Sequence, residues 1–259
     1  MKSIKTPGLR AWLTASALIA SAGCATAPPE PAMVDPGGLL AALPAGCVAE
    51  WQPQTLPGKR ATRYAVAPAE DGRPVVRAQA DRSASLVRHK LRLEPAQFAR
   101  LRFSWRVPAL IADGDVRGRD TEDAPARIVL AFDGDARRLG ERDRLLFDLA
   151  ETLGGERPPF ATLMYVWDAQ APLDSVVVNS RTGRVRKIVV ESGAEQLGRW
   201  RLHERDIAAD YRRAYGEAPG ALIGVALMTD ADNTASRAQA AYGPVCFIAA
   251  DGPGAARPP

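Results

Sequence analysis

The sequence predicts an all-β fold: a two-sheet β-sandwich of the jelly-roll type seen in galactose-binding and concanavalin-like domains, with two short helical insertions. Three observations predict it. Apolar segments of strand length follow one another along the chain, turn-forming residues separate them, and only two stretches have a helical period. Roughly 200 residues lie between end segments rich in Pro, Ala and Gly, which is enough for one domain with a large core.

The clearest strand covers residues 101–107. Leu101, Phe103, Trp105 and Val107 alternate there with polar side chains, and this period of two is typical of a strand with one buried face. Further strands are expected at 73–80, 85–93, 127–132, 161–167, 174–178, 184–190 and 222–228, with a hairpin turn at 180–183 and a closing strand within 241–247.

Two stretches are expected to be helical. The first spans residues 135–153, where four leucines fall on one stripe and Asp135 is the expected N-cap. The second begins after Asp206, its expected N-cap, and ends at Gly216. The leucines of the first stretch are Leu139, Leu146, Leu149 and Leu153.

The N-terminus has the layout of a secretory signal. Lys2, Lys5 and Arg10 precede an apolar stretch, residues 11–20, that is too short to span a membrane. Residues 21–24, Ser-Ala-Gly-Cys, resemble a lipobox, which would make Cys24 the lipidated first residue of the mature protein. The alternative is ordinary cleavage after Ala22.

The segments on either side of the domain follow from this layout. Residues 1–23 are the expected signal peptide, residues 24–45 a tether rich in Pro, Ala and Gly, residues 46–250 the β-sandwich and residues 251–259 a disordered tail. Ala25 follows the lipidation residue, which favours sorting to the outer membrane, facing the periplasm or the cell surface.

The cysteine count supports the lipoprotein prediction. The chain has three cysteines, Cys24, Cys47 and Cys246, and an odd count in an exported protein leaves one thiol unpaired. If Cys24 carries lipid, the other two are free to form a disulfide. Cys47 opens the predicted domain and Cys246 lies in its closing strand, so we expect them to pair.

Charge argues against one class of partner. The formal net charge is +4, and the signal peptide contributes three cations and no anions, so the mature chain has a net charge of +4 − 3 = +1. That balance does not favour nucleic acid. The expected partners are the membrane, through the lipid anchor, and a glycan or another envelope component.

The stretch from 221 to 247 contains the first expected site. A near-continuous apolar run, 222–228, reads as a buried central strand and leads into a loop with Asp230, Asp232 and Asn233. Such strand ends often present ligand-binding groups. With Glu122 and Asp123, the two aspartates could bind calcium through carboxylate oxygens. The alternative is that these acids cap turns without any metal.

The second expected site combines aromatic and polar residues. Sugar rings stack on aromatic faces while acids, amides and arginines bind their hydroxyl groups. The alternative is that the aromatic residues belong to the core, because they alternate on one strand. The residues are Arg127, Tyr165, Trp167, Asp168 and Asn179.

No nucleophile motif appears in the chain. It has two histidines, His89 and His203, and lacks Gly-x-Ser-x-Gly, His-Glu-x-x-His and P-loop patterns. A glycosidase mechanism needs two carboxylates, for which Glu191 and Asp230 are the best pair.

Blocks of sequence along most of the chain, from about Cys47 to Phe247, resemble a bacterial family, the domain of unknown function 3047. The blocks are Phe103-Ser-Trp-Arg-Val, Glu122-Asp-Ala-Pro-Ala-Arg-Ile, Tyr165-Val-Trp, Val189-Val-Glu-Ser-Gly, Trp200, Asp210-Tyr-Arg-Arg-Ala-Tyr-Gly, Met228-Thr-Asp-Ala-Asp-Asn-Thr and Ala240-Ala-Tyr-Gly. The resemblance implies a secreted, mostly β domain and no established activity. The family usually has an aspartate after the last Tyr-Gly, where this chain has Pro244.

Together these observations predict an exported, lipid-anchored β-sandwich that binds a glycan or another envelope component. The alternative is a glycan-cleaving hydrolase that uses loop carboxylates.

Overall fold

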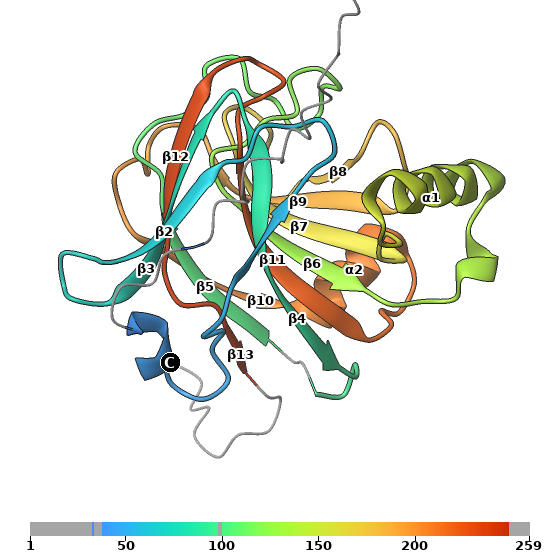
Figure 1. Cartoon of the computed structure of the whole chain (residues 1–259), viewed down its shortest axis with the longest axis horizontal. Coiled ribbons are helices and arrows are strands. Elements are labelled where there is room, and N and C mark those ends of the chain that lie inside the picture. The colour runs from blue at the N-terminus through green and yellow to red at the C-terminus, as the bar shows by residue number, and fades with distance from the viewer. Residues whose placement is uncertain (1–32, 34–37, 98–99, 249–259) are drawn as a thin grey trace, which may run out of the picture.

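The computed structural model describes residues 33, 38–97 and 100–248 of the chain. Two β-sheets face each other in these residues, with one helix at an end of the sandwich and one beside it (Figure 1). The β-sandwich expected from the sequence is confirmed.

The larger sheet has seven strands in the order β1-β4-β11-β6-β7-β9-β8. Its neighbouring strands are antiparallel except β7 and β9, which are parallel. Its strands are β1 (Gln52–Thr55), β4 (Ala84–Leu93), β6 (Arg127–Phe132), β7 (Ala161–Asp168), β8 (Val176–Val178), β9 (Val185–Ser192) and β11 (Leu222–Asp230).

The smaller sheet has six strands, in the order β10-β5-β12-β3-β2, with β13 also paired to β5. Its strands are β2 (Arg63–Pro68), β3 (Pro74–Asp81), β5 (Arg100–Arg106), β10 (Arg201–Asp206), β12 (Arg237–Tyr242) and β13 (Cys246–Ile248). The sequence predicted β3 and β5 well, because their alternation is regular. It missed β2 and β10, which lie at the two edges of this sheet and have few large apolar residues. The expected closing strand, 241–247, is divided: Tyr242 ends β12, which begins earlier than expected, and Cys246 begins β13.

The core between the sheets is aromatic. Phe103 and Trp105 point inward from β5, and Tyr165 and Trp167 point inward from β7; all four side chains are fully buried. The ring centroids of Phe103 and Tyr165 are 5.6 Å apart, and those of Trp105 and Trp167 are 6.4 Å apart. Aromatic pairs at these distances attract each other beyond their buried area.

Helix α2 (Ile207–Tyr215) packs against the core and agrees with its prediction. The side chain of Asp206 caps it by accepting a hydrogen bond from the Ala209 amide at 2.9 Å. Gly216 ends it in the left-handed conformation, with φ of 71°. Tyr211 of α2 lies against Phe132 at the end of β6, with ring centroids 4.7 Å apart.

The first predicted helix is partly wrong. Helix α1 covers Glu141–Gly154, and a separate short 3-10 helix, η2 (Ala136–Arg138), precedes it. Asp135 caps η2 rather than α1. The predicted stripe does not face the core as a whole, because Leu149 and Leu153 are 55% and 66% exposed. Leu139, which lies before α1, is buried in the core, and within α1 Phe147 is buried there with Leu146 packed against it.

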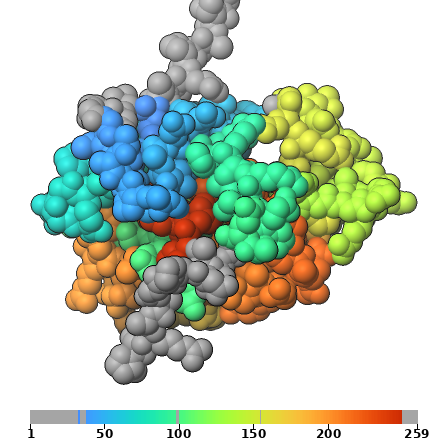
Figure 2. All heavy atoms as spheres, turned by 90° about the horizontal axis from the view of Figure 1, so that it is seen from below, coloured from blue at the N-terminus to red at the C-terminus, as the bar shows by residue number. Residues whose placement is uncertain are grey.

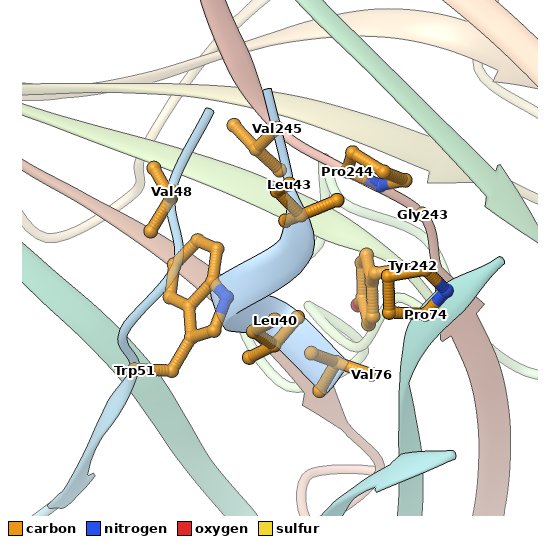
Figure 3. Close-up of a pocket in the computed structure, with 10 residues that line it drawn as sticks. All are labelled: Leu40, Leu43, Val48, Trp51, Pro74, Val76, Tyr242, Gly243, Pro244 and Val245. Atoms are coloured by element: carbon orange, nitrogen blue, oxygen red, sulfur yellow. The ribbon is translucent and has the colours of Figure 1, made fainter. Parts of the chain in front are cut away.

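The folded part of the chain begins before residue 46. A 3-10 helix, η1 (Leu39–Ala42), places Leu40 against the core with 4% exposure, so this part of the predicted tether is structured. The side chains of Leu40, Trp51 and Tyr242 line a small apolar cavity of about 10 Å³ beside η1 (Figure 3). It has room for about one water molecule. The expected signal peptide and tail, and Cys24, lie outside the described residues.

Cys47 and Cys246 form a disulfide across 199 residues of sequence, as expected. Cys47 lies just before β1 and Cys246 opens β13, so the bond ties the first part of the domain to the last. Within the part of the chain that the structure describes, no helix has the length and apolar character of a membrane span.

Replacing both Cys47 and Cys246 with serine should lower the free energy of unfolding by about 2–5 kcal/mol, because the unfolded chain regains the entropy that the long loop had lost. Urea denaturation of the variant checks this value, and Cys24→Ser is the control that leaves the bridge intact. Equal stability of the double variant and the control would contradict the prediction.

Candidate functional site

Polar side chains converge on the outer face of the larger sheet, where β6 begins and β11 ends. Arg127 of β6 pairs in register with Met228 of β11. Because side chains alternate along a strand, Asp230 lies on the same face two residues further on. The loop between β5 and β6 covers this region, and its Val116 belongs to one buried apolar cluster with Val166 of β7.

Arg127 and Asp230 form a buried bidentate ion pair. Nε of Arg127 lies 2.8 Å from Oδ1 of Asp230, and Nη2 lies 2.9 Å from Oδ2. The two residues are 2% and 4% exposed. The Ala124 amide also donates to Asp230, at 3.2 Å. Burial raises the pKa of Asp230 to about 6, while the Arg127 charge acts in the opposite direction.

Glu122 lies at the centre of the second part of the site. Its carboxylate accepts two hydrogen bonds from Asn179 Nδ2, at 2.8 and 2.9 Å, and lies 2.8 Å from Lys187 Nζ. Its backbone oxygen accepts from Arg127 Nη2. Glu122 therefore links the Arg127 pair to a turn and a strand that are more than fifty residues away in the sequence.

Lys187 is fully buried although it lies on the outer face of the sheet. Besides Glu122, its ammonium group donates to the backbone oxygen of Val116 at 2.8 Å. Burial lowers the pKa of Lys187, the Arg127 charge lowers it further, and the carboxylate of Glu122 opposes both. The sequence analysis missed this residue. The sequence feature that could have pointed to Lys187 is a lysine at an outward position of a strand that is rich in valine and isoleucine.

Asp168 and Asp123 hold the backbone of loops. Asp168 Oδ2 accepts from the Val116 amide at 2.8 Å, and its Oδ1 accepts from the amides of Gln170 and Ala171. Asp123 Oδ2 accepts from the amide and hydroxyl of Thr234, at 2.8 and 2.6 Å. These bonds fix the loops around the site, so the alternative of a turn-capping role is supported for Asp123, and Asp168 has the same kind of role.

The loop after β11 is joined to the same site. The Asn233 amide donates to Asp123 Oδ1 at 3.3 Å, and Asp232 forms an ion pair with Lys59. The side chain of Lys59 is 43% exposed, so this pair lies at the surface, unlike the pair of Arg127 with Asp230.

The expected calcium ligands come together only in part. Ligand oxygens of Asp123, Asp230 and Asp232 lie within 4.8 Å of one another, whereas Glu122 faces Asn179 and Lys187. All three aspartates already accept hydrogen bonds from amide, hydroxyl, arginine or lysine groups of the chain. A calcium ion would have to displace those donors, so this arrangement fits the ion poorly.

The expected aromatic platform is wrong. Tyr165 and Trp167 lie in the core with no exposed surface, so neither ring has a face for a sugar. The Tyr165 hydroxyl donates to Asp210 of α2 at 2.9 Å, and Trp167 Nε1 donates to the Gly193 oxygen at 3.1 Å. The even spacing of these rings on one strand face reflects packing between the sheets, which was the alternative.

The two carboxylates expected for hydrolysis are engaged in separate networks. Glu191 lies 2.7 Å from Arg201 Nε and 3.3 Å from His203 Nε2, at the side of the sandwich where β9 faces β10. Burial first, and then Arg201 and Arg205, lower the pKa of His203 to about 4, so its imidazole is neutral at neutral pH. Among the described contacts, none joins Glu191 to Asp230.

Fold and site together define a class of protein: a β-sandwich with a cluster of buried charges on the outside of one sheet. The chain matches the family described as "Protein of unknown function (DUF3047)" over residues 49–246, and it belongs to this family. The resemblance found in the sequence is thereby confirmed. No curated protein matches the chain.

Two solved structures show weak likeness to the chain. One is the glycoside hydrolase domain of Endo-D from Streptococcus pneumoniae, with a TM-score of 0.33 and 12% identity over 75% of this chain and 21% of that one. The other is the family 11 xylanase from Neocallimastix patriciarum, with a TM-score of 0.28 and 9% identity over 76% of this chain and 96% of that one. This chain thus spans about a fifth of the first protein's length. Likenesses at this level say nothing about a substrate.

Asp230→Asn and Asp232→Asn should differ sharply in stability. The first leaves the Arg127 charge buried without a counterion, which costs about 3–5 kcal/mol. The second removes the partner of a surface lysine, which costs about 1 kcal/mol or less. Urea denaturation of both variants measures the difference. Similar losses in the two would show that the buried pair has no special place in the fold.

Proposed function

We propose that this protein is an exported, lipid-anchored envelope component whose β-sandwich binds a glycan or another envelope component at the outer face of the larger sheet. One observation carries the proposal. Glu122, Asn179, Lys187 and Arg127 come from separate segments and converge on the side of the sheet that faces away from the core.

Buried charges on an outer sheet face are an expensive way to stabilise a fold, because apolar residues of similar size often do so as well or better. Groups with shifted pKa values are concentrated at functional sites. Glu122 and Asn179 are the partly exposed members of the cluster. The buried Arg127 and Lys187 hold Glu122 in place: Arg127 donates to its backbone oxygen, and Lys187 pairs with its carboxylate. Such fixed carboxylate and amide groups are suited to hydroxyl-rich ligands.

The alternative function, glycan cleavage, has less support. A glycosidase needs one carboxyl group free to donate a proton and a second facing the same bond. Asp230 is held by two nitrogens of one guanidinium group, and Glu191 pairs with Arg201 in another part of the fold.

Export is supported by the signal layout at residues 1–23 and by the disulfide between Cys47 and Cys246, since structural disulfides are typical of oxidising compartments. Lipidation at Cys24 accounts for the third cysteine. The proposed location is the outer membrane, facing the periplasm or the cell surface.

Cys24→Ser should release the protein from membranes into the soluble fraction, because the variant has no residue for lipid attachment. Fractionation of cells followed by immunoblotting measures this, and Cys47→Ser is the control that keeps the lipidation residue. A Cys24→Ser protein that remains in the membrane fraction and migrates as before would rule out the lipid anchor.

Glu122→Gln should weaken glycan binding about tenfold or more, equivalent to about 1.4 kcal/mol, because it removes the carboxylate while nearly keeping its shape. Because the buried Lys187 loses its counterion in this variant, thermal melting first has to show that the variant is folded. A glycan array on the protein purified in mild detergent identifies ligands, and calorimetry then compares the variants. Glu151→Gln, on the exposed side of α1, is the control; if both variants bind as the wild type does, the cluster is not the site.

A further inference from the structure

Lys187 differs from the other lysines that the structure describes. Lys59 and Lys90 form ion pairs at the surface, where their side chains are 43% and 57% exposed. Lys187 has no exposed surface. Its amino group can therefore act on neighbouring side chains of the chain itself, not on a molecule in the solvent.

Asn179 is one of these neighbours. In the antiparallel pair of β8 and β9, Lys187 is in register with Val177, and the Asn179 amide donates to the Val185 oxygen at 3.0 Å. Side chains alternate along both strands, so Asn179 and Lys187 lie on the same face as diagonal neighbours. Nζ of Lys187 and Nδ2 of Asn179 each lie 2.8 Å from the same oxygen, Oε1 of Glu122. The two nitrogens are thus at most twice that distance apart.

The side-chain amide of Asn179 is held at both of its ends. Its Oδ1 accepts hydrogen bonds from the backbone amides of Arg181 and Thr182, at 2.9 and 3.3 Å. Its Nδ2 faces the carboxylate of Glu122. Donors in the position of these two amides stabilise the negative charge that develops on a carbonyl oxygen when a nucleophile adds to its carbon. The amide is therefore arranged as the acceptor of an acyl transfer, with a carboxylate beside its leaving nitrogen.

The turn that carries this amide is fixed from outside the sheet. The Thr182 hydroxyl donates to Asp143 of α1 at 2.7 Å and accepts from the Arg184 amide at 3.0 Å. In Figure 2 the yellow-green atoms of α1 form one side of the molecule, against which the turn is held. A turn fixed in this way keeps reacting groups in place, and such positioning lowers the barrier of a reaction within one molecule.

The surroundings of Lys187 favour the nucleophilic form of its amine. A lysine attacks a carbonyl group only after it has lost its extra proton, and burial or a nearby cation promotes that loss. Burial lowers the pKa of Lys187, the Arg127 charge lowers it further, and Glu122 opposes both. Glu122 is also the group that can take the proton. The neutral amine can then donate to Glu122 and to the Val116 oxygen, and it keeps its lone pair for the attack.

We propose that Lys187 and Asn179 become joined by an isopeptide bond, which forms within the folded chain with Glu122 as the proton-transfer group. Nζ of Lys187 adds to Cγ of Asn179 and forms the new C–N bond. Glu122 carries a proton from Nζ to Nδ2, the bond between Cγ and Nδ2 breaks, and ammonia leaves. Glu122 regains its charge, and no oxidant or second reactant is needed.

The bond would change how the edge of the larger sheet behaves. Strand β8 has three residues and lies at the edge, with β9 as its one neighbour in the sheet. Short edge strands are among the first elements to open locally. A covalent link between Asn179 and Lys187 keeps β8 attached to β9. This role goes beyond the proposed glycan binding and does not rest on it.

Peptide masses test the proposal. The full protein is exported, purified in detergent, reduced and digested with trypsin, which cleaves after an unmodified Lys187 and releases the peptide Ile188–Arg199. A linked Lys187 is not cleaved. The digest then contains the peptide that ends at Arg181 joined to the peptide that begins at Lys187, lighter than the two by one molecule of ammonia. A succinimide at Asn179 also loses ammonia, but it leaves Lys187 open to trypsin.

Two variants and a control identify the reacting groups. Asn179→Ala removes the acceptor and keeps the ion pair of Lys187 with Glu122, so it should release Ile188–Arg199. Glu122→Gln, once thermal melting shows that it is folded, should remain mostly unlinked, because proton transfer by a side chain typically contributes about a hundredfold or more to a rate. Lys90→Gln removes a surface lysine and should be linked as the wild type is.

The wild-type digest decides even if a variant fails to fold. Release of Ile188–Arg199 in full yield, with no linked pair, overturns the cross-link. A link from Lys187 to another residue in Asn179→Ala overturns the assignment of Asn179, and complete linkage in folded Glu122→Gln overturns the role of Glu122. No ligand enters this measurement, whereas glycan binding is measured by calorimetry, so either proposal can fail while the other stands.

Discussion

The ion pair between Arg127 and Asp230 is the constraint around which the outer face of the larger sheet is arranged. An arginine cannot lose its charge inside a protein, so its burial requires a fixed counterion and partners for its remaining N–H groups. Asp230 is the counterion, and the backbone of Glu122 is a further partner. Both depend on loops folding down over the sheet, and those loops are in turn fixed by Asp123 and Asp168. Removing the pair would therefore affect more than two side chains.

The same loops explain why one face of the sheet has two characters. Near the start of β6 the face is covered and charged, and it includes the fully buried Lys187. Further along β6 and β11 it is lined by glycine, alanine and valine, and ion pairs join β4 to Glu156 and to Asp133.

The fold could be predicted from the sequence where the period of two was clean, as in β5, and where caps were specific, as with Asp206 and Gly216 of α2. The predictions failed where local pattern and tertiary contact disagreed. In α1 the last three leucines of the stripe were correctly recognised as helical, but Leu149 and Leu153 remain exposed because the helix packs on the core through Leu146 and Phe147. The parallel pairing of β7 with β9 could not be predicted, since no local signal distinguishes a parallel neighbour from an antiparallel one.

For the candidate site, the sequence singled out oxygen-bearing residues that lie close together in the fold, but it did not predict their contacts. Arg127, Asn179 and Asp230 do meet, because two strands and a turn bring them together, but their contacts depend on Glu122 and Lys187. A lysine inside a valine-rich strand becomes informative only when the strand's outward face is known to be covered. Tyr165 and Trp167 were predicted with the wrong orientation, since the same alternation places a ring on either side of a sheet.

The bond between Cys47 and Cys246 also has a mechanical meaning. Tension applied to the chain before Cys47 passes through the disulfide into β13 and from there into β5, which lies within the smaller sheet. Without the bond, the same tension would act first on β1, an edge strand of four residues that could be peeled away from β4. The domain can therefore be pulled by its N-terminal segment without first losing β1.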